Sequence, residues 1–186
     1  MFDADNLKRL SVATLDDFLD YFDHRAFLDN AEWSGCYCQF YLGTPDEDIP
    51  LDQKIDQNRK LACSRVETGA MEGYLLYSED KVIAWCAAGS SMLYPDFPDA
   101  QELLARILCF NVDPDLRGQG VASALLNLVV ADLAERGFEA VEAAPVTKVL
   151  PNRIPYRGTL TMFLSQGFTE VVSFPDNHTL VRKYLN

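Results

Sequence analysis

The spacing of apolar residues along the first half of the chain predicts short strands and two helices. Residues 10–13 have the pattern of a strand, and Thr14 with the two acids that follow it suits the start of a helix that ends near Asp23. Residues 52–68 form a polar segment of helical character. Two apolar runs, at residues 73–77 and 81–88, flank the turn residues Ser78-Glu79-Asp80 and predict an antiparallel hairpin.

The second half predicts a strand at residues 106–112, a mostly apolar helix at 121–133 and a strand at 138–144. A strand, a helix and a strand in this order form a crossover whose two strands are parallel. A further helix near residues 158–166 and strands at 168–174 and 179–184 follow. The alternation predicts a single α/β or α+β domain over residues 1–186 with antiparallel strands in its N-terminal half.

Composition and charge narrow the possible partners. The 186 residues are 48% hydrophobic and 24% charged, which is typical of a folded protein rather than a disordered or fibrous one. Sixteen Lys and Arg against 28 Asp and Glu give a net charge of −12, a sign that repels nucleic acid and anionic lipid. We therefore expect neither nucleic acid nor membrane as a partner.

The five cysteines are odd in number and irregularly spaced, in a chain large enough to fold without disulfides. They lack the paired spacing of zinc sites, so we expect free thiols and no metal. The N-terminus has no basic segment followed by an apolar run, and no window approaches the roughly 20 apolar residues of a membrane helix. These features predict a cytoplasmic protein.

The segment with the clearest chemistry joins the strand that ends at Val112 to the helix that starts after Gly120. Helix N-termini carry amide N–H groups without internal partners, and glycines at 118 and 120 allow a close approach, so the turn suits a pyrophosphate. Arg117 would add a positive charge. A Walker A loop is excluded because Val121 and Ala122 stand where lysine and Ser or Thr are needed. A dinucleotide-binding turn and a plain helix start without ligand stay open.

Arg117-x-x-Gly120-x-Ala122 between such a strand and such a helix resembles the acetyl-CoA motif of the GNAT N-acetyltransferase superfamily. The late segment that ends in Gly167-Phe168 is similar to the last helix of that family. Finer features resemble a bacterial group of GNAT proteins whose substrate is unassigned: Trp33-Ser34-Gly35-Cys36-Tyr37-Cys38, Val82-Ile83-Ala84-Trp85-Cys86 and Tyr156-Arg157-Gly158-Thr159.

The resemblance implies a mixed central sheet, flanked by helices, with antiparallel N-terminal strands and a parallel pair that splays apart around acetyl-CoA. It implies acetyl transfer to a primary amine of a small molecule or protein, directly from the thioester. It assigns the amides of Phe110, Asn111 and Val112 to the pantetheine and acetyl carbonyl. It assigns binding of the pyrophosphate to the turn and the start of the helix, which comprise Arg117, Gly118, Gln119, Gly120, Val121, Ala122 and Ser123.

The residues for proton transfer depart from the family pattern. Many family members have a tyrosine four residues before the late glycine, where it acts as the general acid that protonates the thiolate of CoA. This chain has Phe163 at that position, and we expect it to lie beside the cofactor. Tyr156 is a candidate substitute if the helix extends that far, and a packing tyrosine is the alternative. Glu142, an acid in an apolar strand, is the candidate general base, with an outward-facing solvated glutamate as the alternative.

Most of the negative charge lies in residues 1–100, which hold 8 basic and 19 acidic side chains. In the family this half shapes the acceptor side, so its field predicts a cationic amine or polyamine as acceptor. A CoA-binding sensor without turnover and an NAD-binding oxidoreductase are the alternative functions. The sequence leaves the acceptor, the acyl length and a possible homodimer open.

Overall fold

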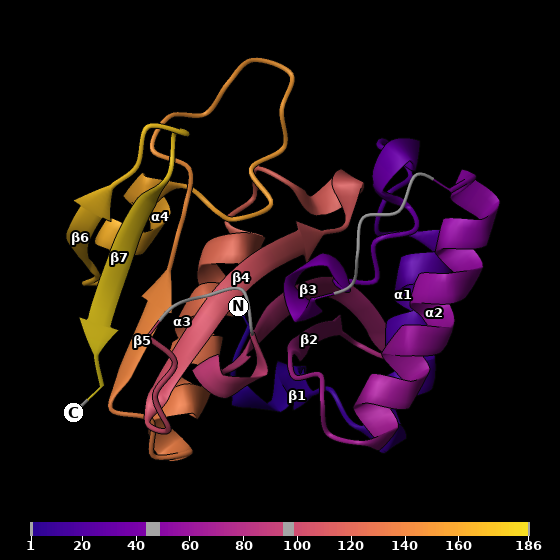
Figure 1. Ribbon diagram of the computed structural model, residues 1–186, viewed down its shortest axis with the longest axis horizontal. Coiled ribbons are helices and arrows are strands. Elements are labelled where there is room, and N and C mark those ends of the chain that lie inside the picture. The colour runs from indigo at the N-terminus through magenta and orange to yellow at the C-terminus, as the bar shows by residue number, and fades with distance from the viewer. Residues whose placement is uncertain (1, 44–48, 95–98, 186) are drawn as a thin grey trace.

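The structure is a computed structural model that describes residues 2–43, 49–94 and 99–185. Within these residues seven strands form one sheet in the order β1-β2-β3-β4-β5-β7-β6 (Figure 1). Neighbouring strands are antiparallel except β4 and β5, which are parallel. The strands are β1 (Leu7–Arg9), β2 (Tyr74–Ser78), β3 (Lys81–Ser90), β4 (Leu104–Val112), β5 (Ala140–Ala143), β6 (Thr169–Ser173) and β7 (Thr179–Tyr184).

Helices pack against both faces of the sheet because the strand residues alternate between two apolar cores. Trp85 of β3 belongs to the core formed with α1 (Leu15–His24) and α2 (Leu51–Glu67), whereas its neighbour Cys86 belongs to the core formed with α3 (Val121–Glu135). Helix α4 (Leu160–Leu164) adds Phe163 to the second core. Each face of the sheet is therefore buried by a different set of helices.

The parallel pair opens part-way along its length. β5 pairs with β4 from Leu104↔Ala140 to Ile107↔Ala143 and then ends. β4 continues for five residues, to Val112, and in this part it pairs with β3 alone. The loop between β5 and α4 rises above the sheet at this point (Figure 1). The gap beside the end of β4 is the position that a splayed pair would leave for a ligand.

The predicted hairpin, the crossover and the two final strands are confirmed, while two elements differ from the sequence-based expectation. Residues 12–14 form a 3-10 turn, and the first strand is β1, three residues earlier in the chain. Helix α4 is shorter than expected because Thr159 caps it: its hydroxyl accepts a hydrogen bond from the amide of Met162. Within the described residues, none of the helices combines the length and apolarity needed to cross a bilayer.

Candidate active site

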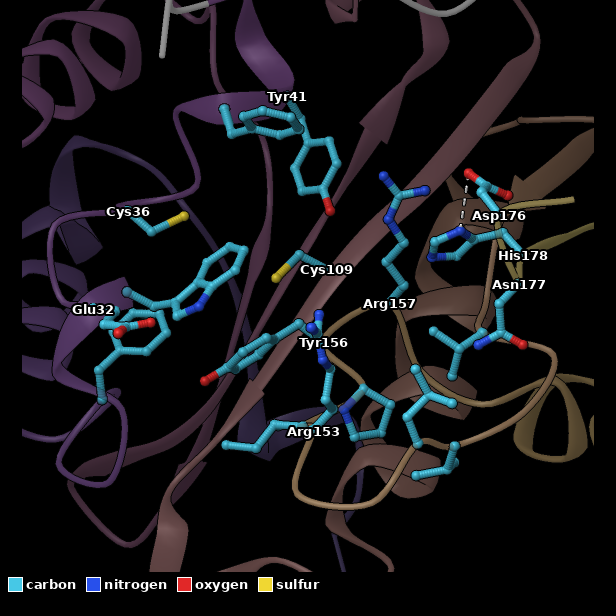
Figure 2. A pocket seen from close by; sticks show the side chains of 18 of the residues that line it. Glu32, Cys36, Tyr41, Cys109, Arg153, Tyr156, Arg157, Asp176, Asn177 and His178 are labelled. Carbon is cyan, nitrogen blue, oxygen red and sulfur yellow. Dashed lines mark ion pairs between the residues drawn. The ribbon is translucent and has the colours of Figure 1, made fainter. Parts of the chain in front are cut away.

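A cavity of about 700 Å³ lies on the α1 and α2 side of the sheet, where β4 and β5 have separated (Figure 2). Its walls come from five parts of the chain: the segment after α1, helix α2, strand β4, the loop between β5 and α4, and the hairpin between β6 and β7. Cys109 of β4 is part of its lining, and Figure 2 shows its thiol pointing inward. The cavity therefore reaches the part of β4 that β5 leaves uncovered.

Tyr156 lines this cavity from the loop before α4, outside the helix. Its ring packs between those of Phe27 and Trp33, with centroid distances of 5.8 and 5.7 Å. Its hydroxyl oxygen accepts a hydrogen bond of 3.2 Å from Asn30 Nδ2. Burial raises the pKa of Tyr156 above its ordinary value, so the hydroxyl keeps its proton at neutral pH. The side chain is thus a protonated donor, and it lines the cavity from the loop, without the helical extension that was the condition for its role.

The backbone of Tyr156 is joined to β4. The amide of Phe110 donates a hydrogen bond to the carbonyl oxygen of Tyr156, directly beside the gap. Amide directions alternate along a strand, and Asp113 N donates to Ile83 O of β3, so Asn111 N–H points to β3 as well. The amide of Val112 shares the direction of Phe110. Of the three amides expected to bind the thioester arm, only the one at Val112 points to the gap without a partner in the described residues.

The turn between β4 and α3 has the geometry of an anion site. Gly118 and Gly120 have φ values of +74° and +82°, which favour glycine, and a Cβ on either would meet no atom within 4 Å. Gly120 is the N-cap of α3, and the first turn of that helix has no acidic residue. The space beside both glycines of this exposed turn is therefore open, and the first turn of α3 offers N-terminal amide groups with no carboxylate of its own.

The sequence matches the Acetyltransferase (GNAT) family over residues 16–154, a stretch that contains β4, this turn and α3. The chain belongs to this family. Among curated proteins no sequence matches it.

Solved structures of acetyltransferases share the fold of this GNAT chain at low sequence identity. The ribosomal-protein-S18-alanine N-acetyltransferase from Escherichia coli has a TM-score of 0.55 at 15% identity, and the superposition covers 97% of this chain and 93% of that enzyme's chain. A probable acetyltransferase from Staphylococcus epidermidis has a TM-score of 0.57 at 14% identity, covering 97% and 99%. The PaiA N-acetyltransferase from Thermoplasma acidophilum, in complex with coenzyme A, has a TM-score of 0.54 at 11% identity, covering 96% and 98%. A doubly wound dinucleotide-binding fold would need a mostly parallel sheet, unlike the one described here.

The side chains of Arg117, expected to add its charge to the pyrophosphate site, and of Asn111, expected to contribute only its amide, both have partners within the protein. Arg117 forms an ion pair with Asp29, and its Nε donates to the carbonyl oxygen of Val112 at 3.0 Å. Asn111 Oδ1 accepts from Tyr21 Oη at 2.7 Å, and Asn111 Nδ2 donates to Ala26 O at 2.9 Å. Both side chains join the end of β4 and the turn after it to α1 and the segment that follows it.

The remaining residues of the predicted CoA turn are placed as expected in α3 and the loop before it. Gln119 Nε2 donates to Asp115 O, within the turn. The carbonyl oxygen of Ser123 accepts from Gln166 Nε2 at 2.6 Å, which ties the start of α3 to the end of α4. Val121 is buried in the core, while Ala122 packs at its edge. Their contact with a cofactor stays a prediction.

Phe163 lies in the core rather than at the cavity. Its side chain is fully buried, and its ring contacts those of Phe110 and Phe168 edge-on at 6.1 and 4.9 Å. The expected contact between Phe163 and the cofactor has no support in this geometry, because no part of the ring reaches solvent. At the position where many family members have the general-acid tyrosine, this chain therefore has a phenylalanine that packs in the core.

Glu142 has the partners of a structural carboxylate. It is buried on β5 and forms ion pairs with Arg182 of β7 and, at 3.6 Å, with Arg106 of β4. The hydrogen bonds that Arg182 donates to Glu142 raise the pKa of Arg182, and the carboxylate is absent from the cavity lining. The expectation of an outward-facing solvated glutamate is wrong. Its role as general base stays a prediction, and the ion pairs support a structural role instead.

The cysteines are free thiols in the structure. A hydrogen bond with Cys38 and burial raise the pKa of Cys36, and Cys38 accepts a hydrogen bond of 3.0 Å from Trp85 Nε1. A protonated thiol is a poor nucleophile, so Cys36 is a wall residue of the cavity. In the part of the chain that the structure describes, no three His, Cys, Asp or Glu side chains are grouped to hold a metal ion.

Sequence reasoning gave no role to Asn30 or to Arg157, which both lie at this site. Asn30 carries no local signal, because its partner Tyr156 is 126 positions away. Arg157 carried a weak one: it is the last of three basic residues, with Lys148 and Arg153, in one loop of an otherwise acidic chain. All three line the cavity.

Proposed function

We propose that this GNAT protein transfers the acetyl group of acetyl-CoA directly to a primary amine bound in the cavity. The amine nitrogen attacks the thioester carbonyl carbon, a C–N bond forms and the C–S bond breaks. The proton lost by the nitrogen balances the thiolate of CoA. The observation that carries the proposal is the family match over residues 16–154, which includes the open glycine turn and the end of β4.

The two halves of the site suit the two substrates. Glycines 118 and 120 leave space for a pyrophosphate at the amide groups of α3, and a related fold has been solved in complex with coenzyme A. The cavity lies on the other side of β4 and contains none of residues 117–123 in its lining. An acceptor in the cavity and a thioester in the gap would then meet beside Cys109 and Tyr156.

Replacing Gly120 by alanine tests the pyrophosphate site. We expect the Kd for acetyl-CoA to rise at least tenfold, because the added Cβ projects into the open space over the turn. The positive φ of +82° adds a stability cost of about 1 kcal/mol. The measurement is titration calorimetry with acetyl-CoA, accompanied by thermal unfolding.

Gly137 provides a matched control at the other end of α3. It also has a positive φ, +86°, and open space around its Cβ position. The Gly137→Ala variant should lose the same stability and keep the Kd of the unchanged protein. Equal affinity in both variants would place the pyrophosphate elsewhere.

Release of free CoA thiol from acetyl-CoA, measured with a panel of primary amines, tests the transfer itself. We expect thiol release that depends on both substrates, with a matching N-acetylated product seen by mass spectrometry. Binding of acetyl-CoA without turnover on any amine would favour a CoA-binding sensor, the function that Phe163 at the usual tyrosine position makes the main alternative. Absence of acetyl-CoA binding would refute both.

A further inference from the structure

The charged groups of the cavity are arranged by depth. Arg157 and Lys54 are half-buried in its wall, and the other two basic residues of the lining, Lys148 and Arg153, are exposed. The two acidic residues of the lining, Glu32 and Asp176, are both exposed at its rim. His178, also half-buried, lies 3.3 Å from Asp176 through its Nδ1. The interior of the cavity is therefore positive, although the protein as a whole carries a net charge of −12.

Arg157 occupies the inner part of this surface. Figure 2 shows its side chain reaching from the loop toward the hydroxyl of Tyr41, and its guanidinium carbon lies 5.5 Å from the centre of the Tyr41 ring. The aromatic contact holds the guanidinium in place without neutralising it. Within the described residues, no carboxylate forms an ion pair with Arg157, whereas Arg106, Arg136 and Arg182 each pair with a glutamate.

We propose that the acceptor amine carries a carboxylate, as an amino acid does, and that Arg157 binds this carboxylate. This rests on the function proposed above and names the acceptor class for the same cavity. A guanidinium presents a planar pair of donors that matches a carboxylate, and partial burial strengthens the interaction.

The position of Arg157 also sets where the amine end of such a molecule lies. Arg157 follows Tyr156, whose carbonyl oxygen is bonded to the Phe110 amide at the gap beside β4. A carboxylate held by Arg157 places the rest of a compact molecule toward Cys109 and Tyr156, where the thioester is expected. A small amino acid has the short separation between amine and carboxylate that this arrangement needs.

An acceptor that carries a carboxylate differs from the cationic acceptor that the net charge of the protein predicts. Charges farther apart than a Debye length, about 8 Å at physiological ionic strength, are largely screened in solvent. The groups that line the cavity therefore decide its selectivity, and the acids on outer surfaces such as Asp16 and Asp20 of α1 do not. The acidic residues of the outer surface therefore do not determine which acceptor the cavity binds.

The test is titration calorimetry on the complex with CoA, using paired ligands that differ only in charge: glycine against glycinamide, β-alanine against β-alaninamide, and the diamine putrescine. We expect a carboxylate member to bind at least tenfold more tightly than its amide. Arg157→Gln should reduce that ratio to about one, and Arg157→Lys should restore part of it. The Kd for CoA itself should stay the same in both variants.

Arg59→Gln is the matched control, because this guanidinium pairs with Asp23 and lies outside the cavity lining. It should keep the full preference for carboxylates. Equal binding of acid and amide, no carboxylate binding at millimolar concentration, or tighter binding of the diamine would each overturn the proposal. Weaker CoA binding in Arg157→Gln, with the acid preference kept, would assign the arginine to a CoA phosphate instead. Acetyl transfer is measured separately, as thiol release. A failure of transfer would therefore count against the proposed function and would leave the binding preference of Arg157 to the calorimetry.

Discussion

Replacing Glu142 by alanine is expected to lower the free energy of unfolding by about 3–5 kcal/mol. The substitution leaves the buried Arg106 and the half-buried Arg182 without their shared carboxylate, in a part of the sheet that joins β4, β5 and β7. Removing one partner of a buried ion pair costs more than the pair itself contributes, because the remaining charge stays desolvated. Urea denaturation followed by circular dichroism measures the change.

Glu139→Ala is the control for this variant, since Glu139 lies just before the same strand and is exposed. Its effect should stay within about 0.5 kcal/mol. Glu142→Gln then separates structure from catalysis. If the carboxylate is structural, this variant keeps the acidic limb of the kcat/KM profile at temperatures where it is folded. Loss of that limb would restore Glu142 as the general base.

Replacing Tyr156 by phenylalanine is expected to lower kcat about 10²-fold with little change in KM. The reason is that this hydroxyl is a protonated donor in the cavity, on a residue whose carbonyl oxygen accepts a hydrogen bond from the Phe110 amide at the gap. Asn30 donates to its oxygen, so the hydroxyl proton of Tyr156 stays available to the thiolate of CoA. Initial rates of thiol release at varied substrate concentrations give kcat and KM.

The pH dependence follows from the direction of the pKa shift. Burial raises the pKa of Tyr156 above its ordinary value near 10, so the donor form persists through neutral and mildly alkaline pH. No loss of kcat from this group is expected below about pH 10. Tyr77→Phe is the control, because that hydroxyl is hydrogen-bonded to Asp17 away from the cavity and should affect stability only. An unchanged kcat in Tyr156→Phe would make Tyr156 a packing residue.

Much of the fold could be predicted from the sequence because its elements rest on local patterns. The apolar run of α3, the proline break after β4 and the two glycines of the turn are contiguous, and all three are present in the structure. The first strand was misplaced because β1 has only three residues, too few for a periodic signal. The length of α4 was overestimated because its cap, Thr159, is a single residue within an ambiguous segment.

The site was predicted less completely because its side chains find partners far along the chain. Tyr156 lines the cavity and its catalytic role stays a prediction, while its hydrogen bond to Asn30 spans 126 positions. The ion pair between Glu142 and Arg182 spans 40 positions, and it gives a buried acid a partner that no local pattern indicates. Arg117 was assigned to the pyrophosphate from its place in the turn, whereas Asp29, 88 positions away, binds its guanidinium.

The sequence by itself determined the strand, glycine turn and helix of the CoA half, because backbone conformation and helix-end amides depend on neighbouring residues. It also determined the net charge, −12, and through it the expectation of a cationic acceptor. Only the tertiary structure decided the charge inside the cavity, because folding brings the loop of residues 146–157 against the segment after α1 and leaves the acids at the rim. Selectivity for a ligand depends on the desolvated groups that surround it, and those groups are chosen by the fold rather than by the sum of the charges.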